Sequence, residues 1–112
     1  MSVPPRRHHP APLPTTPRTR VVPLSDGTEA PVVLELFYWE MLDDIATREA
    51  TTAADLVREI DRRRALLPHA MVLEVALRLF CVSYYQQAAG MSGSLAEESI
   101  GQLMDKAIRF GR

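Results

Sequence analysis

The feature that most constrains this chain is a change in the spacing of apolar residues between Ala30 and Trp39. Val32 and Leu34 place apolar side chains on one face of a short strand. From Trp39 onward the apolar residues recur every three or four positions, at Leu42, Ile45 and Ala46. Side chains alternate faces in a strand, whereas residues three and four apart share a helix face, so the switch predicts a strand running directly into a helix. A lone short strand leaves its backbone groups unpaired and therefore needs a partner from this chain or from another.

The bulk composition indicates one small globular domain. The chain has 112 residues, 46% of them hydrophobic and 24% charged, with a net charge of −1. A net charge this small does not indicate electrostatic attraction to nucleic acid or to a membrane surface. Cys81 is the single cysteine, which excludes an intrachain disulfide and a cysteine-based zinc site. No apolar run has the length of a membrane span, and the N-terminus lacks a signal-peptide pattern, so a reducing, bacterial-type cytoplasm is expected.

Residues 1–19 are rich in proline and contain no acidic residue. Proline fixes φ and removes backbone donors, so we expect an extended arm here rather than a helix or strand. Two interpretations remain open. The arm either contacts phosphate or an acidic protein groove through its arginines, or it is a solvated tail.

Residues 20–89 contain the elements of the predicted domain. An Asp26-Gly27 pair follows a β-prone run and predicts a hairpin from about Arg20 to about Leu34. Helices are expected over 36–49, 53–64 and 69–88, with Thr52 and Asp55 capping the second. Apolar residues nearly encircle the third helix, so most of its surface must be covered, which favours an oligomer.

Residues 90–112 are expected to form a hinge followed by an amphipathic helix over about 94–110. Ser94 and Glu97 have the spacing of a capping box at its start. The apolar stripe of this helix includes Leu103, Ala107 and Phe110. It either covers the third helix of its own subunit or docks on a protein partner.

The sequence contains no recognisable catalytic constellation. It has no Gly-rich phosphate loop, no paired metal-binding histidines on a helix, and no nucleophile with a histidine and an acid in a known arrangement. We therefore expect neither enzyme activity nor a bound metal or cofactor.

Several of these segments resemble a bacterial ribbon-helix-helix subfamily. Val32-Val33-Leu34-Glu35 followed by Tyr38-Trp39-Glu40 resembles its strand-to-helix junction, in which a β-prone triplet precedes Leu-Glu and an aromatic-Trp pair. Residues 56–61 are similar to its second helix, and residues 76–80 resemble a third helix that the subfamily adds. The resemblance covers about Arg20 to Tyr85.

The resemblance implies a mostly α fold with a short β-ribbon, here a ribbon-helix-helix dimer with additional C-terminal helices. Strands from two subunits would pair into one ribbon that lies in the DNA major groove, making a homodimeric transcriptional regulator. The implied dimer core consists of Val32, Leu34, Trp39, Leu42, Leu56 and Ile60. The implied base-reading positions are Pro31, Val33 and Glu35, with Thr51 and Thr52 at a phosphate-binding turn before the second helix. Arg18 and Arg20 are further candidate DNA-binding residues, because their side chains are basic.

The chain departs from the family pattern on the face that reads DNA. Pro31 and Val33 stand where family members usually carry hydrogen-bonding side chains, and Glu35 can only accept a hydrogen bond. Ala50 replaces the usual glycine between the first two helices, although that turn favours a left-handed residue. Two functions are therefore carried forward. One is DNA-binding regulation, with phosphate contacts from Arg6, Arg7, Arg18 and Arg20. The other is a ribbon-helix-helix scaffold that has lost base readout and serves protein–protein interaction or assembly.

Overall fold

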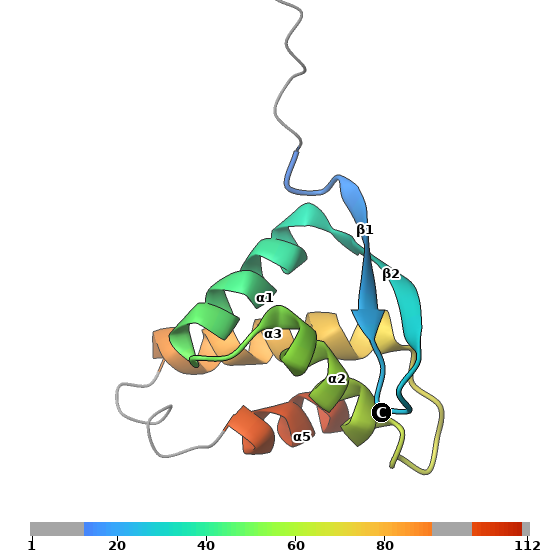
Figure 1. The fold of residues 1–112 in the computed structure, drawn as a ribbon. Helices are drawn as coiled ribbons and strands as arrows, with labels where there is room; N and C mark the ends of the chain where they lie inside the picture. Colours follow the sequence, from blue (N-terminus) through green and yellow to red (C-terminus); the bar gives the residue numbers. More distant parts are fainter. Residues whose placement is uncertain (1–12, 91–99, 111–112) are drawn as a thin grey trace, which may run out of the picture.

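The computed structural model describes residues 13–90 and 100–110 (Figure 1). Two antiparallel strands are followed by helices that pack beneath and beside them. Arg6 and Arg7, and the expected capping box at Ser94 and Glu97, lie outside the described residues. None of the described helices is long and apolar enough to cross a membrane.

The two strands form a hairpin within one chain. Strand β1 (Pro17–Pro23) pairs with β2 (Glu29–Glu35) in a register that sets Arg20 opposite Val32. The first strand therefore begins at Pro17, so residues 17–19 belong to the hairpin and not to the arm. The partner that β2 requires is thus β1, where the family resemblance implied a strand from a second subunit.

The turn between the strands is formed by the predicted Asp-Gly pair. The Leu24 amide donates to the Thr28 carbonyl over 2.8 Å, and the Gly27 amide donates to the Leu24 carbonyl over 3.2 Å. Gly27 has a φ of 89°, a conformation that glycine adopts without a steric cost. The Asp26 carboxylate accepts from both the amide and the hydroxyl of Thr28, which rigidifies the turn and lowers the pKa of Asp26.

Four helices follow the hairpin in the described part of the chain. They are α1 (Leu36–Arg48), α2 (Ala53–Arg64), α3 (Leu73–Gly90) and α5 (Ile100–Phe110). The prediction for α2 matches its bounds. The prediction for α3 started at residue 69, four residues too early. The Val72 carbonyl accepts the first helical bonds, and the Arg64 guanidinium instead takes the Met71 carbonyl over 2.8 Å.

A left-handed residue ends α1, as the sequence indicated. Ala50 has a φ of 57°, and the Thr51 amide donates back to the Ala46 carbonyl over 2.9 Å. This six-to-one bond is typical of the C-terminal motif that normally carries glycine. Thr52 then caps α2, because its hydroxyl accepts from the Asp55 amide over 3.1 Å.

The hydrophobic core is closed within one chain. All six residues expected in a dimer core are at most 3% exposed in the single subunit; they are Val32, Leu34, Trp39, Leu42, Leu56 and Ile60. Their burial therefore does not require a second subunit. The C-terminal helix α5 packs on α3 of its own chain, with Leu103 and Met104 each 1% exposed. Helix α5 therefore covers part of the surface of α3. Val75 and Val82 on α3 remain partly exposed.

Two tyrosines of α3 join this helix to the last turns of α1. The Tyr84 hydroxyl donates to Glu49 over 2.8 Å, and the Tyr85 hydroxyl donates to Asp44. Burial and these carboxylate acceptors raise the pKa of each tyrosine to about 12. The hydroxyls are therefore neutral donors at physiological pH, and they fix α1 against α3.

Candidate nucleic-acid interface

The outer face of the hairpin is the most open apolar surface near predicted site residues. Val21 of β1 is 66% exposed, and Val33 of β2 is 46% exposed. Pro31 lies opposite Val21, and Thr19 lies opposite Val33, so these four side chains share the outward face. Cross-strand neighbours on one face lie about 5 Å apart. The sequence analysis placed Pro31 and Val33 on this face, and the structure agrees.

The opposite face of the hairpin is anchored to the helices. Val22, Val32 and Leu34 point inward and are at most 4% exposed. At the turn, the amide and hydroxyl of Ser25 both donate to one oxygen of Asp61 on α2, each over 2.8 Å. Asp61 is 4% exposed and also pairs with Arg64 over 2.7 Å. Burial alone would raise the pKa of Asp61, but the donors from Ser25 and Arg64 outweigh it and lower the pKa.

The two predicted arginines of β1 are placed differently. Arg18 is exposed, and its guanidinium has no acceptor among the described residues, whereas its carbonyl accepts from the Trp39 indole N–H over 2.9 Å. Arg20 is held in a bidentate ion pair with Asp43 of α1. The Asp43 hydrogen bond raises the pKa of Arg20 further above its ordinary value. Arg18 is thus available to a ligand, and Arg20 is engaged within the fold.

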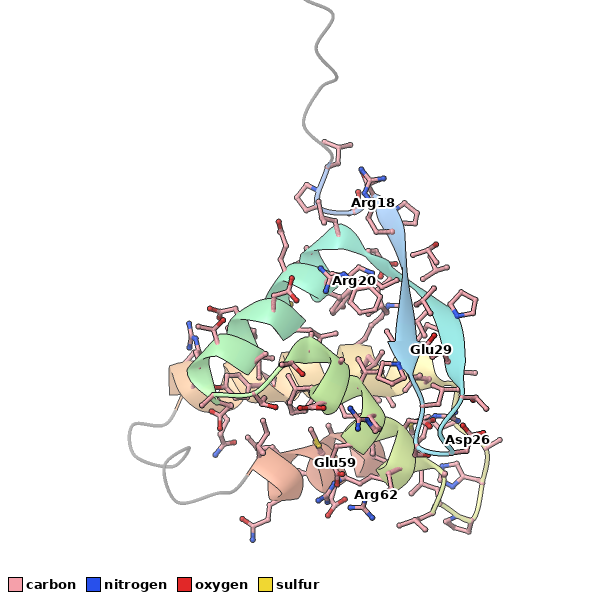
Figure 2. The ribbon with its side chains drawn as sticks, in the orientation of Figure 1. Arg18, Arg20, Asp26, Glu29, Glu59 and Arg62 are labelled. Atoms are coloured by element: carbon pink, nitrogen blue, oxygen red, sulfur yellow. The ribbon has the colours of Figure 1, made fainter. Side chains whose placement is uncertain are left out.

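Charge is graded along the hairpin. Figure 2 shows Arg18 at the open end, and Asp26 and Glu29 toward the turn. A polyanion would therefore be attracted at the end that joins the arm and repelled at the turn.

Glu35 does not belong to the open face. Its carboxylate accepts from Arg78 of α3 over 2.9 and 3.3 Å, and it is half-buried. The Arg78 hydrogen bond lowers the pKa of Glu35 and keeps it ionised. Glu35 therefore pairs with Arg78 where β2 meets the helices. This contact differs from the expected contact of Glu35 with a base.

Thr51 and Thr52 lie away from the hairpin, at the far end of α1. This 13-residue helix is about 20 Å long, so the two groups of predicted site residues are not brought together. Thr52 uses its hydroxyl as a cap, and Asp55 stands in the first turn of α2 with Arg58 at 2.6 Å. The Asp55 carboxylate already interacts favourably with the positive end of the α2 dipole, and it would repel a phosphate at this helix N-terminus.

Most other arginines with described side chains are committed to ion pairs. These residues, which each pair with an acidic residue of the same chain, are Arg48, Arg58, Arg62, Arg63, Arg64 and Arg78.

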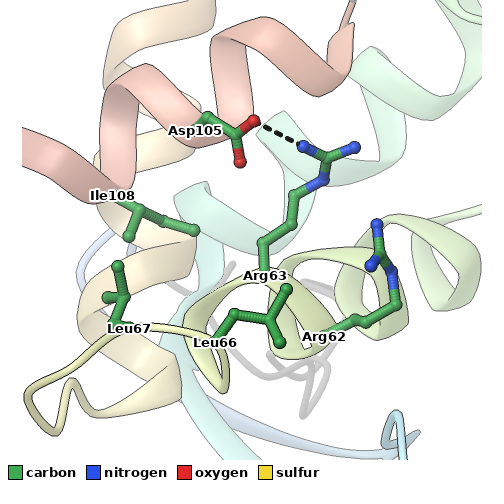
Figure 3. A pocket seen from close by; sticks show the side chains of 6 residues that line it. All are labelled: Arg62, Arg63, Leu66, Leu67, Asp105 and Ile108. Carbon is green, nitrogen blue, oxygen red and sulfur yellow. Dashed lines mark hydrogen bonds and ion pairs between the residues drawn. The ribbon is translucent and has the colours of Figure 1, made fainter.

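A cleft of about 370 Å³ lies between the end of α2 and α5 (Figure 3). Its lining includes the Arg63–Asp105 pair at 2.8 Å and the apolar side chains of Leu66, Leu67 and Ile108. No cluster that could hold a metal is found among the described residues.

Sequence reasoning missed two acidic residues that organise this interface, Asp43 and Asp61. Helical periodicity does not reveal that Asp43 of α1 has a partner, Arg20, on a distant strand. The signal for Asp61 was present, since it follows the buried Val57 by four residues on the same helix face.

Comparisons with known proteins agree with this architecture. The model of the ribbon-helix-helix domain family matches residues 17–85, which spans the hairpin and helices α1 to α3 as far as Tyr85. A solved structure of an uncharacterized protein from Bordetella pertussis Tohama I is similar, with a TM-score of 0.58 and 27% sequence identity. The similarity covers 88% of this chain and 80% of that one. No curated protein matches the chain. The chain therefore belongs to the ribbon-helix-helix domain family.

Proposed function

We propose that this protein is a DNA-binding transcriptional regulator that lays its hairpin in the major groove. The observation that carries the proposal is the hairpin itself. Its inner face is packed in the core, while its outer face is open and ends at the guanidinium of Arg18, which has no acceptor among the described residues. The family resemblance and the family match support the same type of function.

The dimensions and side chains of the hairpin suit this role. The major groove is about 12 Å wide and admits a two-stranded ribbon, whose strands lie about 5 Å apart. Val21 and Val33 would contact thymine methyl groups, and the Thr19 hydroxyl can donate to or accept from a base edge. Arg18 would contact a phosphate or a guanine. This set of groups predicts a preference for T-rich sites with modest selectivity.

A homodimer is part of the proposal, because ribbon-helix-helix proteins usually pair. Two copies would place two hairpins on neighbouring stretches of one DNA molecule. The N-terminal arm would add phosphate contacts through its arginines, so binding should weaken steeply as salt rises.

The proposal is tested by fluorescence anisotropy with short duplexes, T-rich and GC-rich, at low salt. Val33→Asp places a charge on the outer face and should abolish binding. Val82→Asp is a matched control, since Val82 is 40% exposed and belongs to α3, outside the hairpin strands. Wild-type affinity in the Val33→Asp protein, with an intact circular dichroism spectrum, would refute the DNA-binding face.

The alternative function is a protein-interaction scaffold, and the apolar outer face specifically favours it. Val21, Pro31 and Val33 form an exposed apolar patch, and Arg20, on the other face of β1, is already neutralised by Asp43. This function predicts no binding to either duplex at low salt. It also predicts that Val33→Arg loses a protein partner while the fold is retained. Retention of every partner by that variant would exclude the scaffold function for this face.

A further inference from the structure

We infer that the cleft between the end of α2 and α5 binds a small amphipathic anion, in which an apolar chain or ring carries one carboxylate. The apolar part lies against Leu66, Leu67 and Ile108, and the carboxylate pairs with Arg62. The site is formed by α2, α5 and the residues that follow α2, outside the hairpin strands, so it is independent of the proposed function.

The size and lining of the cleft are those of a small-molecule site. Its volume is about 370 Å³. Ligand pockets measure about 300 to 1,000 Å³ and combine apolar walls with a few polar groups. Figure 3 shows the apolar side chains next to one another, with Arg62 on the side opposite Ile108. A molecule that lies along the cleft therefore meets an apolar end and a charged end.

The apolar wall is held in place by the fold itself. Ile108 of α5 is 2% exposed, and Leu67 packs half-buried against the core. The amides of Leu66 and Leu67 donate to the carbonyls of Arg63 and Arg64 over 3.2 and 3.1 Å, which fixes the turn after α2. Leu66 is nevertheless 73% exposed, more than any other large hydrophobic side chain in the described part of the chain. A ligand that covers Leu66 removes this apolar surface from water, which favours binding.

Arg63 is engaged in holding α5 and is not available to a ligand. Its Nε donates to Glu59 over 2.8 Å, and its Nη1 donates to the Gly101 carbonyl over 3.1 Å and to Asp105 over 2.8 Å. The guanidinium is also confined sterically, since a Cβ at Gly101 would stand 2.7 Å from Nη2. Asp105 is therefore neutralised within the fold. A cationic ligand would have to displace Arg63 from Asp105, and this requirement disfavours cations.

Arg62, in contrast, can change partner at little cost. Its side chain is 52% exposed, and it donates to both carboxylate oxygens of Glu59. Oxygen Oε2 of Glu59 accepts from Arg62 and Arg63 together, so Glu59 keeps one cation when Arg62 turns to a ligand. Exposed ion pairs contribute little to stability, and a ligand carboxylate offers the same bidentate geometry as Glu59. The exchange therefore replaces one carboxylate with another and leaves no charge of the cleft without a partner.

Proton–nitrogen correlation NMR on the full chain tests the site, with octanoate as the anionic probe. Octanol and octylamine are matched probes, because they keep the apolar chain and change the charge of the head group. Octanoate should give saturable shifts of the amide signals of residues 62–67 and 105–108. It should bind at least about 10-fold more tightly than octanol or octylamine. The absence of saturable shifts at these residues, or equal affinity for octanoate and either matched probe, would overturn the inference.

Two substitutions separate the charged end of the cleft from its apolar end. Arg62→Gln should weaken octanoate binding by about 10-fold and leave octanol binding unchanged, whereas Leu66→Ser should weaken the binding of both. Both side chains are exposed, so the variants should keep the fold, which circular dichroism checks. Arg58→Gln is the matched control, since Arg58 is half exposed on α2 and paired with Asp55 but does not line the cleft. Octanoate affinity that is the same in Arg62→Gln as in the wild type would refute the site.

Discussion

Both carboxylate oxygens of Asp43 accept from the guanidinium of Arg20, each over 2.9 Å. The same guanidinium lies 4.7 Å from the ring centroid of Trp39. A cation at the rim of the candidate interface is therefore held by an acid of α1 and by an aromatic ring. The pair is half exposed, so it stabilises the fold by no more than about 1 kcal/mol. It can be released without unfolding the protein.

Replacement of Asp43 should strengthen DNA binding if the hairpin lies in the groove. Asp43→Asn removes a negative charge and frees Arg20 for a phosphate, which should raise affinity at low salt by about 5-fold. The slope of log affinity against log salt should steepen by about 1. Anisotropy titrations at several salt concentrations measure both quantities.

Glu40→Gln is the matched control for this prediction. Glu40 is exposed on the same helix, and its replacement changes the net charge equally without releasing an arginine. The control should leave the salt slope unchanged. An equal gain in both variants would mean that only net charge matters and that Arg20 makes no contact.

The conformation of Ala50 leads to a prediction about stability. Its φ of 57° places a Cβ in the left-handed region, which costs roughly 1 kcal/mol relative to glycine. Ala50→Gly should therefore raise the free energy of unfolding by about 1 kcal/mol in urea titrations. Ala54→Gly, on the exposed side of α2, should lower it by up to about 1 kcal/mol. Destabilisation by both substitutions would contradict the left-handed turn.

Sequence periodicity was sufficient for the elements that depend on local patterns. The bounds of α2, the Asp26-Gly27 turn and the cap from Thr52 all arise from residues within four positions of one another. The strain at Ala50 was predicted for the same reason, since a helix that ends in a left-handed residue favours glycine.

The remaining features depend on contacts between distant residues. The start of α3 was wrong because Arg64 takes the Met71 carbonyl, a contact that no helical pattern encodes. The roles of Arg20 and Glu35 were missed because their partners, Asp43 and Arg78, lie 23 and 43 positions away. The exposure of Pro31 and Val33 could therefore be predicted from strand alternation, whereas the ion pairs of Arg20 and Glu35 could not.

Asp61 should make the stability of the domain depend on acidity. Its pKa is lowered in the folded state by donors from Ser25 and Arg64, so the folded state favours the carboxylate. This contribution is present above the unfolded pKa of about 3.9 and is lost as pH falls through the lowered folded value. Asp61→Asn should cost about 3 kcal/mol at neutral pH, because it leaves Arg64 without its ion-pair partner. Urea titrations at several pH values between neutrality and strong acid measure both effects.

The control for Asp61 is Asp55→Asn, which removes an exposed carboxylate from the same helix. It should cost about 1 kcal/mol or less. The wild type should lose more stability than the Asp61→Asn protein as pH falls below about 4. If the two proteins lose the same amount, Asp61 is not the group that links the hairpin turn to acidity.

Truncation of Leu103 tests whether α5 is part of the fold or a free docking helix. Leu103 is 1% exposed against α3, and Arg63 further holds α5 through Asp105 and the Gly101 carbonyl. Leu103→Ala should therefore lower the free energy of unfolding by about 2 to 4 kcal/mol and lower the thermal midpoint. Glu74→Ala, at a solvent-accessible position in the first turn of α3, serves as the surface control and should change stability by less than about 1 kcal/mol. If α5 were instead a free docking helix, Leu103→Ala would leave the free energy of unfolding unchanged. Since the apolar stripe of α5 already fills the space over α3, we expect the loss of stability, and we expect any docking surface to lie elsewhere.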